Sequence, residues 1–283
     1  MREVRTRSLA GLSKGGFHQI SYRESGPPDP VPVLCIHGLA RNARDFDALA
    51  AVLAAAGRRV VAVDVVGRGD SGRLDDPLDY GYPQYLADIT ALIARLDCRA
   101  LDIVGTSMGG LIGMLLAAQS GTPLRRLVMN DVGPFIPKAA LERILDYVGK
   151  DPRFADVEEA EAYHRKIYRG FGALSDAQWR HLTETSLRRE GEGWRLHYAP
   201  GIAVPLRAAP PADVDLWALW DRVACPVLVL RGAQSDLLLP ETAREMTGRG
   251  ARAELIEVPG CGHAPALLEP AQTHAIRDWL AGG

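Results

Sequence analysis

A serine in a glycine-rich turn is the first group in this sequence that could do covalent chemistry. The stretch Gly105-Thr106-Ser107-Met108-Gly109-Gly110 follows the apolar run 101–104 and precedes the apolar run 111–118. A strand, a Gly-x-Ser-x-Gly turn and a helix in this order put the serine on a sharp bend with its hydroxyl exposed. Gly105 and Gly109 leave room for that bend because they carry no Cβ atom. The context predicts that Ser107 is a nucleophile.

A serine hydroxyl needs a neighbouring base to become reactive, and histidine is the usual base near neutral pH. His263 lies in the glycine-rich stretch 259–265, just beyond the last strand that the sequence predicts. That position brings it to the same edge of the sheet as Ser107. We therefore choose His263 from the seven histidines of the chain.

The imidazole needs a carboxylate that fixes its orientation and stabilises its charged form. Asp236 follows the apolar stretch 226–232 and gives the chain order serine, acid, histidine. Asp131 is the alternative, because it ends the strand that follows Ser107 and its helix. We favour Asp236 for its order and loop position, and Asp131 stays open.

The third requirement is a pair of N–H groups for the oxyanion. With a Gly-x-Ser-x-Gly turn, the usual donors are the backbone N–H of the residue after the serine and a backbone N–H of the loop after an earlier strand. We therefore expect the Met108 N–H and the Leu39 N–H to be the donors. Leu39 belongs to the loop that starts at His37-Gly38, after the apolar strand 33–36. His37 could be a second base, but a hydrogen-bonding role that holds this loop is the more ordinary one.

Five residues around the loop and the turn are candidates for substrate contact. The segment 41–46 follows the loop and is expected to line the rim of the pocket. A guanidinium there could hold a substrate carboxylate through a forked contact, although loop arginines are more often solvated. The candidates are His37, Gly38, Arg41, Arg44 and Thr106.

Strand-like and helix-like patterns alternate along the chain, as expected for a parallel sheet with helices on both faces. Apolar periodicity predicts helices in the regions 46–53, 86–96, 111–118 and 270–280. The alternating stretch 17–22 predicts an antiparallel edge strand. The other expected strands are 33–36, 60–64, 101–104, 127–131, 226–232 and 254–259.

Nearly a hundred residues between Asp131 and Pro226 interrupt this alternation, which is far more than the usual connection in such a sheet. The interruption has helical patches at 140–148 and 158–163 and holds four of the five tryptophans. We predict a core of residues 1–133 and 215–283, and a helical lid of residues 134–214 over the carboxyl ends of the strands, where ligands enter open α/β sheets.

Composition excludes several classes of function. The chain has 283 residues, is 47% hydrophobic and carries a formal net charge of −2, which is typical of a globular protein. Neither a basic run nor an uninterrupted apolar segment suggests a nucleic acid or a membrane as partner. The four cysteines fit no zinc or redox spacing, and the first residues resemble no secretory signal. We expect a cytoplasmic protein that works without cofactor or metal on a small molecule, and we leave its oligomeric state open.

Five motifs in order resemble the α/β-hydrolase superfamily: His37-Gly38, Gly67-Arg68-Gly69-Asp70-Ser71, the Ser107 turn, the stretch from Arg231-Gly232 to Asp236, and Gly262-His263. The resemblance spans almost the whole chain and implies the α/β-hydrolase fold, the three catalytic roles and a lid. Its serine sets the chain apart from haloalkane dehalogenases and epoxide hydrolases, which use aspartate. The loop lacks the triple glycine of some lipases and esterases. Thr106 stands where carbon–carbon bond hydrolases usually carry asparagine.

Three hypotheses on function follow. The leading one is a serine hydrolase that cleaves a carboxylic ester through an acyl-enzyme, with Ser107, Asp236 and His263 as the catalytic residues. The second keeps these residues and changes the bond to a carbon–carbon bond of a diketone, an amide or a lactone. The third is a binding protein on a hydrolase scaffold, which the presence of all three residue types disfavours. Superfamily resemblance alone does not identify the substrate.

Overall fold

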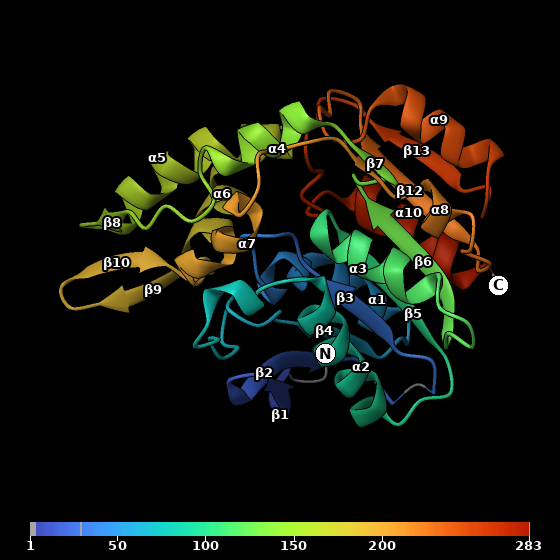
Figure 1. The fold of residues 1–283 in the computed structure, drawn as a ribbon, viewed down its shortest axis with the longest axis horizontal. Helices are drawn as coiled ribbons and strands as arrows, with labels where there is room; N and C mark the ends of the chain where they lie inside the picture. Colours follow the sequence, from blue (N-terminus) through green and yellow to red (C-terminus); the bar gives the residue numbers. More distant parts are fainter. Residues whose placement is uncertain (1–3, 29, 283) are drawn as a thin grey trace.

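The computed structural model describes residues 4–28 and 30–282, which form a central sheet with helices on both faces and a large insertion (Figure 1). The strands of the central sheet are β1 (Arg5–Ser13), β2 (Gly16–Ser25), β3 (Val33–Ile36), β4 (Val60–Val63), β5 (Leu101–Thr106), β6 (Leu124–Asn130), β12 (Val227–Gly232) and β13 (Glu254–Val258). The helices around it are α1 (Asp47–Ala55), α2 (Tyr82–Leu96), α3 (Met108–Ala117), α8 (Trp217–Trp220), α9 (Pro240–Gly248) and α10 (Pro270–Ala281), with short 3₁₀ helices η1 (Ala43–Phe46) and η2 (Pro77–Asp79).

The strand order is β1-β2-β4-β3-β5-β6-β12-β13. Strands β3 to β6, β12 and β13 pair in parallel, while β2 is antiparallel to both of its neighbours. The stretch predicted as an edge strand is therefore an antiparallel strand, β2, but it does not form the edge. Strand β1 pairs outside it. Most β1 side chains are exposed, so β1 lacks the alternating apolar pattern by which a half-buried strand is found.

Alternate residues of the inner strands point to opposite faces of the sheet, as the pleat requires. On β3, Leu34 and Ile36 pack into the larger core cluster, together with side chains of α2, α3 and α9. Val33 and Cys35 pack into the other cluster, with side chains of α1 and α10. The prediction of helices on both faces of a mostly parallel sheet is confirmed, and both faces of the inner strands are buried.

Residues 134–214, here called the inserted segment, leave the core after β6 and return before α8. Strands β7 (Phe135–Ile136) and β11 (Val214–Asp215) pair where the segment leaves and rejoins the core. It also holds a three-stranded sheet that the helical patches did not predict. Its elements are α4 (Lys138–Leu145), β8 (Arg153–Phe154), α5 (Val157–Ile167), η3 (Arg169–Phe171), α6 (Asp176–Glu184), β9 (Leu187–Glu190), β10 (Gly193–Leu196), η4 (Pro200–Ala203) and α7 (Val204–Arg207). In Figure 1 most of these elements extend to the left of the sheet. Whether this segment works as a lid stays a prediction.

A helix that crosses a bilayer needs about 20 mainly apolar residues. The longest helix in the described ranges, α2, has 15 residues. None of the helices in the described part of the chain is long and apolar enough to cross a membrane.

Candidate active site

Ser107 lies at the bend between β5 and α3, as the sequence predicts. Its backbone has φ +51° and ψ −115°, a conformation that non-glycine residues rarely adopt and that is often found at functional sites. Two glycines make the bend possible. A Cβ atom on Gly105 would lie 2.3 Å from the Gly109 carbonyl oxygen, and one on Gly109 would lie 1.9 Å from the Ile36 carbonyl oxygen. The sharp bend therefore depends on glycine at both positions.

A chain of hydrogen bonds joins three side chains at this bend. His263 Nε2 lies 3.0 Å from Ser107 Oγ, and His263 Nδ1 lies 2.7 Å from Asp131 Oδ2. The Asp131 side chain is fully buried, and the imidazole is largely buried. This geometry allows the imidazole to take the hydroxyl proton while the carboxylate stabilises the resulting positive charge.

The structure corrects the choice of acid. Asp236, the favoured candidate, does not hold His263 but accepts hydrogen bonds from the guanidinium of Arg143, with its side chain half exposed. Asp131, the alternative, makes the contact. The two positions are hard to separate in sequence, because each aspartate follows one of two adjacent parallel strands, β6 and β12.

The loop after β12 supports the acid instead of providing it. The Gly232 N–H donates to Asp131 Oδ1 at 2.8 Å, and the Ser235 hydroxyl donates to Oδ2 at 2.6 Å. Ser235 Oγ also accepts from the N–H groups of Leu237 and Leu238, which fixes the hydroxyl. The sequence reasoning missed Ser235, although its place directly before Asp236 was a usable signal.

His37 holds the loop that was expected to supply an oxyanion donor. Its Nε2 accepts from the Val65 N–H at 2.9 Å, so Nδ1 carries the proton and donates to the Gly38 carbonyl at 2.7 Å. Burial lowers the pKa of His37 to about 4, which keeps the ring neutral. In a trans peptide the carbonyl and the next N–H point in opposite directions. The Leu39 N–H therefore points away from the hydrogen bond at the Gly38 carbonyl.

Arg68 also holds this loop through hydrogen bonds, a role that the sequence reasoning did not assign. Its side chain is fully buried, and its Nε donates to the Leu39 carbonyl at 2.8 Å. Nη1 donates to the Val66 carbonyl and the Tyr85 hydroxyl. Arg68 lies in the Gly67–Ser71 motif, but nothing in the spacing of that motif shows that the arginine is buried.

The two expected oxyanion donors flank Ser107. Met108 is the first residue of α3, where an N–H has no partner inside the helix. Within residues 4–28 and 30–282, the structure gives no hydrogen-bond partner to the N–H of Met108 or of Leu39. Both residues line a cavity that reaches Ser107. Their role as oxyanion donors stays a prediction that this arrangement supports.

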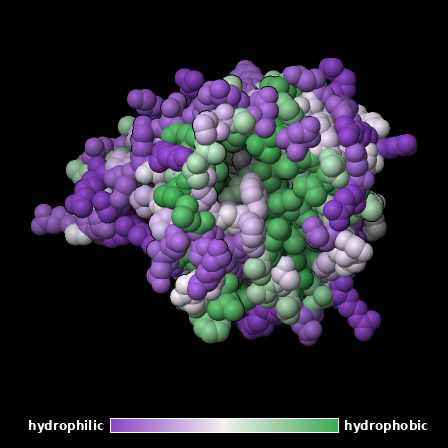
Figure 2. All heavy atoms as spheres, viewed as in Figure 1, coloured by the Kyte–Doolittle hydropathy of each residue, from purple (hydrophilic) through white to green (hydrophobic). Residues whose placement is uncertain are grey.

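Two cavities reach Ser107. The first, called the Arg41 cavity, has a volume of about 50 Å³ and is lined by His263, Arg41, Asp45 and Tyr168 among others. The second, called the apolar cavity, has a volume of about 220 Å³, and its lining includes side chains of α3 and α4, tyrosines of 80–85 and apolar residues of 202–211. Figure 2 shows a hollow on this face between α4 and α3, with hydrophobic residues gathered beside it.

The five candidates for substrate contact divide into two groups. Gly38, Arg41 and Thr106 line the Arg41 cavity. His37 is fully buried behind the loop and lines neither cavity. Arg44 also lines neither cavity, because its guanidinium turns to Asp47 at 2.5 Å. The prediction of substrate contact is therefore unsupported for these last two residues.

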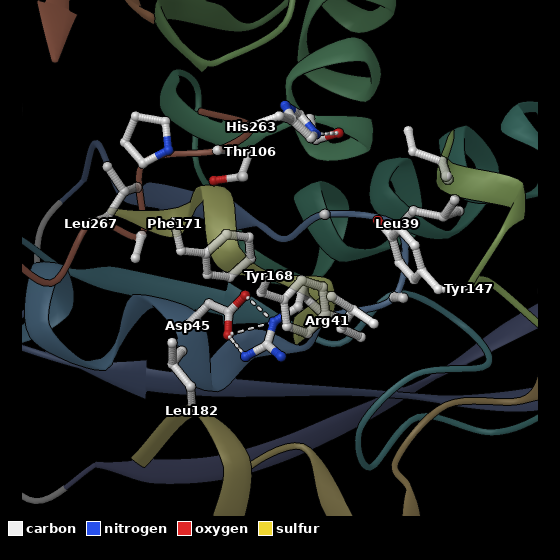
Figure 3. A pocket seen from close by; sticks show the side chains of 18 of the residues that line it. Leu39, Arg41, Asp45, Thr106, Tyr147, Tyr168, Phe171, Leu182, His263 and Leu267 are labelled. Carbon is white, nitrogen blue, oxygen red and sulfur yellow. Dashed lines mark hydrogen bonds and ion pairs between the residues drawn. The ribbon is translucent and has the colours of Figure 1, made fainter. Parts of the chain in front are cut away.

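Arg41 is buried, but its guanidinium already makes a forked contact within the protein. Its Nε and Nη2 donate to both carboxylate oxygens of Asp45, at 2.6–3.2 Å. The ring of Tyr168 stacks on the guanidinium, with 4.9 Å between the Cζ atom and the ring centroid. Figure 3 shows this pair inside the cavity, with the rings of Tyr168 and Phe171 beside it. The forked contact that was expected for a substrate is made to Asp45.

Known proteins resemble this chain over nearly its whole length. It is 45% identical over 281 residues to a 3-hydroxybutyrate-oligomer hydrolase from Cupriavidus necator, and the match covers 96% of each chain. A solved α/β hydrolase from Novosphingobium aromaticivorans superposes with a TM-score of 0.88 at 37% identity, covering 99% of each chain. A solved structure from Rickettsia typhi superposes with a TM-score of 0.91 at 32% identity, also covering 99% of each chain.

The family model that matches is the one described as alpha/beta hydrolase family, and it matches residues 33–276. This range contains Ser107, Asp131 and His263. It also contains the loop at His37 and the whole inserted segment. The chain is thus an enzyme of the hydrolase class, and it belongs to the α/β hydrolase family.

Proposed function

We propose that this enzyme hydrolyses carboxylic esters through an acyl-enzyme on Ser107, and that short oligomers of 3-hydroxybutyrate are its substrates. The observation that carries the proposal is the hydrogen-bonded chain from Ser107 through His263 to Asp131. Such a chain lies at a strained turn, beside two N–H groups that have no hydrogen-bond partner in the described ranges, and so has the parts that acyl transfer requires.

In the first half-reaction, Ser107 Oγ attacks the ester carbonyl carbon while His263 Nε2 takes the hydroxyl proton. The bond from the acyl carbon to the alcohol oxygen then breaks, and His263 returns the proton to that oxygen. In the second half-reaction, water attacks the acyl-enzyme with His263 again as base, which releases the acid and restores Ser107. Asp131 keeps the imidazole oriented throughout.

Charge develops on the carbonyl oxygen in both half-reactions. The N–H groups of Leu39 and Met108 are the donors that we assign to it. His37 and Arg68 act on this step only through the loop, because they hold the carbonyls of Gly38 and Leu39. They are positioning residues.

The substrate class is suggested by the relative from Cupriavidus necator, whose name states that it hydrolyses 3-hydroxybutyrate oligomers. The 45% identity extends over 96% of each chain, so the match is not confined to one part of the fold. An oligomer of this kind is a chain of carboxylic esters, which is the bond that the proposed chemistry breaks.

The test compares wild-type enzyme with Ser107→Ala on the linear dimer of 3-hydroxybutyrate and on p-nitrophenyl butyrate. We expect the variant to lose at least about 10³-fold in kcat on both substrates, as is usual when such a nucleophile is removed. A fluorophosphonate probe should add its mass to Ser107 of the wild type only. Circular dichroism and thermal unfolding show whether the variant is folded.

Two results would contradict parts of the proposal. Ester hydrolysis that survives in a folded Ser107→Ala variant would remove the acyl-enzyme. Rapid turnover of p-nitrophenyl butyrate with none of the dimer would keep the mechanism and remove the substrate class. A panel that adds an amide, a lactone and a diketone shows whether another bond is preferred.

A further inference from the structure

The two cavities at Ser107 differ in how they meet His263. The Arg41 cavity is lined by His263 and by the residues that follow it, 264–267. The apolar cavity is lined by Ser107, Leu39 and Met108 but not by His263. Since both cavities reach the nucleophile, an ester bound there has one half in each.

The proton that His263 returns determines which half of the ester occupies which cavity. The alcohol oxygen must lie within hydrogen-bond reach of His263 Nε2 when the ester bond breaks. The alcohol half therefore occupies the Arg41 cavity, on the side of the imidazole. The acyl half, which stays on Ser107, extends into the apolar cavity.

The Arg41 cavity contains a buried cationic group that is not fully satisfied. Among the residues that the structure describes, Arg41 Nη1 is buried and has no hydrogen-bond partner, while Nε and Nη2 donate to Asp45. A buried donor without a partner destabilises the folded protein, and more so when it is charged. The side chain is 5% exposed, and Tyr168 covers one face of it. A ligand that accepts a hydrogen bond at Nη1 would remove this cost.

Arg41 also lies close to Ser107. A Cβ atom placed on Gly38 would be 3.7 Å from Ser107 Cβ and 3.8 Å from Arg41 Cγ. The Arg41 side chain thus begins close to Ser107, and both residues line the same cavity. A carboxylate that is joined to the leaving oxygen by a short carbon chain could span this distance.

We propose that Arg41 binds the free carboxylate of the alcohol half of the substrate, so that the enzyme cleaves 3-hydroxybutyrate oligomers at the ester bond next to their carboxyl end. This inference rests on the function proposed above and adds the direction of attack. In the carboxyl-terminal unit, two carbon atoms separate the ester oxygen from the carboxylate carbon. Only this unit has a carboxylate close to the scissile bond.

Binding requires a small change at the cavity. Nη1 is covered in the structure, so the carboxylate takes a place beside the ring of Tyr168, which moves aside. Tyr168 belongs to the inserted segment, between α5 and η3. In the reaction, the first product that leaves is the carboxyl-terminal 3-hydroxybutyrate, with the proton from His263 on its new hydroxyl. The shortened oligomer remains as the acyl-enzyme until water releases it.

The outer approach to the cavity fits an anionic leaving group. A groove of about 700 Å³ that reaches His263 is lined by the carboxylate of Asp146, by the ion pair of Arg143 with Asp236, and by Lys150, Lys166 and Arg169. The last three side chains are exposed and make no ion pair in the part of the chain that the structure describes. Their charges are solvated, so they attract an anion without fixing its position. Arg41, which is buried, is the group that fixes it.

The direct test uses wild-type enzyme and a linear 3-hydroxybutyrate trimer whose carboxyl-terminal unit is labelled with ¹³C. Mass spectrometry of the first few per cent of products distinguishes the two ends. We expect labelled monomer and unlabelled dimer. Unlabelled monomer with labelled dimer, or equal amounts of both pairs, would overturn the proposal. Absence of any cleavage of the trimer would instead remove the proposed substrate class, and this inference with it.

The second test measures the contribution of the carboxylate. The ratio of kcat/KM for the dimer to kcat/KM for its carboxyl-terminal amide should be about 10–100 in the wild type, the range for one charge-assisted hydrogen bond. In Arg41→Met the ratio should fall towards one, and in Arg41→Lys it should lie between. Arg44→Met is the matched control, since Arg44 lines neither cavity, and its ratio should equal that of the wild type. A wild-type ratio near one would overturn the proposal, as would an Arg41→Met ratio equal to that of the wild type.

Discussion

The edge of the sheet around Ser107 and the inserted segment are built in different ways. At the sheet edge, backbone atoms approach so closely that a Cβ on Gly109 would lie 1.9 Å from the Ile36 carbonyl oxygen, and buried groups such as Arg68 bond to backbone carbonyls. The inserted segment carries several ion pairs on its surface, such as Arg180 with Glu158. Exposed ion pairs contribute little to stability, whereas buried contacts tolerate little change.

Because of this difference, we assign the chemistry to the sheet edge and the choice of substrate to the inserted segment. The groups that the proposed reaction needs in fixed positions come from loops at the ends of β3, β5 and β6 and from the loop after β13. The inserted segment contributes Tyr168 and other side chains that line the Arg41 cavity, where we propose that the alcohol half binds. We therefore expect changes at the sheet edge to affect kcat strongly, and changes in the inserted segment to affect activity less or through substrate preference.

Asp131→Asn should have the largest effect among the changes that keep Ser107. The amide cannot stabilise the positive charge on His263, and we expect kcat to fall by about 10⁴-fold, as for the equivalent change in a serine protease. Steady-state kinetics on p-nitrophenyl butyrate measures this loss. Asp236→Asn is the matched comparison at the border of the inserted segment, and it should keep kcat within about threefold because Asp236 bonds to Arg143. Equal losses in the two variants would contradict the assignment of Asp131.

Arg68→Met should reduce both activity and stability. The variant leaves the Leu39 and Val66 carbonyls without their donor, which costs about 1–3 kcal/mol for each buried group. We expect kcat to fall by about 10–100-fold because the loop that carries the Leu39 N–H loosens, a smaller loss than the 10²–10³-fold for removing a donor itself. Urea unfolding and kinetics on one ester measure the two effects.

Arg180→Met, in the inserted segment, is the control for Arg68→Met. Its guanidinium is on the surface, so we expect unfolding and kcat close to those of the wild type. If the two arginine variants lose stability to the same extent, the contrast between the two regions is wrong.

Gly170→Ala tests the point where the inserted segment touches the base. The Gly170 carbonyl accepts from the Gly262 N–H at 2.7 Å, and a Cβ on Gly170 would lie 3.1 Å from the backbone N and O of His263. We expect a shift of His263 by a few tenths of an ångström and a loss in kcat of about three- to tenfold, since misplacement by a full ångström can cost 10²-fold. Gly248→Ala, with open space around its Cβ position, should change neither kcat nor unfolding by much. Wild-type kcat in Gly170→Ala would show that the segment does not position the imidazole.

A buried histidine of the inserted segment should make the stability of the fold depend on pH. Burial lowers the pKa of His164 to about 3, from an ordinary value of 6.5. Between these values the unfolded chain binds a proton that the folded chain does not, so the free energy of unfolding decreases as the pH falls through this window.

His164→Gln removes this contribution. Relative to the variant, the wild type should lose about 2 kcal/mol of unfolding free energy between pH 6.5 and pH 4.5, at 1.36 kcal/mol per pKa unit. The raised pKa of Asp64, to about 6 by burial, acts in the opposite direction but is common to both proteins and cancels in the difference. Urea unfolding at several pH values measures this difference in unfolding free energy. Parallel curves of unfolding free energy against pH for the two proteins would contradict a neutral, buried His164.

The sequence by itself determined the parts that depend on local patterns. The run from an apolar strand through Gly105–Gly109 to an apolar helix predicted the bend at Ser107, because only a sharp turn needs glycine on both sides of a polar residue. Apolar runs with glycine and aspartate at their ends predicted the parallel strands, and the glycine-rich loop after the last of them predicted the place of His263.

The tertiary structure decided everything that depends on which segments meet. Asp131 and Asp236 both follow adjacent parallel strands, and only the path of the loop after β12, with the Ser235 hydroxyl turned to Asp131, selects between them. Arg68 and Arg41 resemble solvated arginines in the sequence. Their burial follows from long-range packing, which no local pattern of residues records.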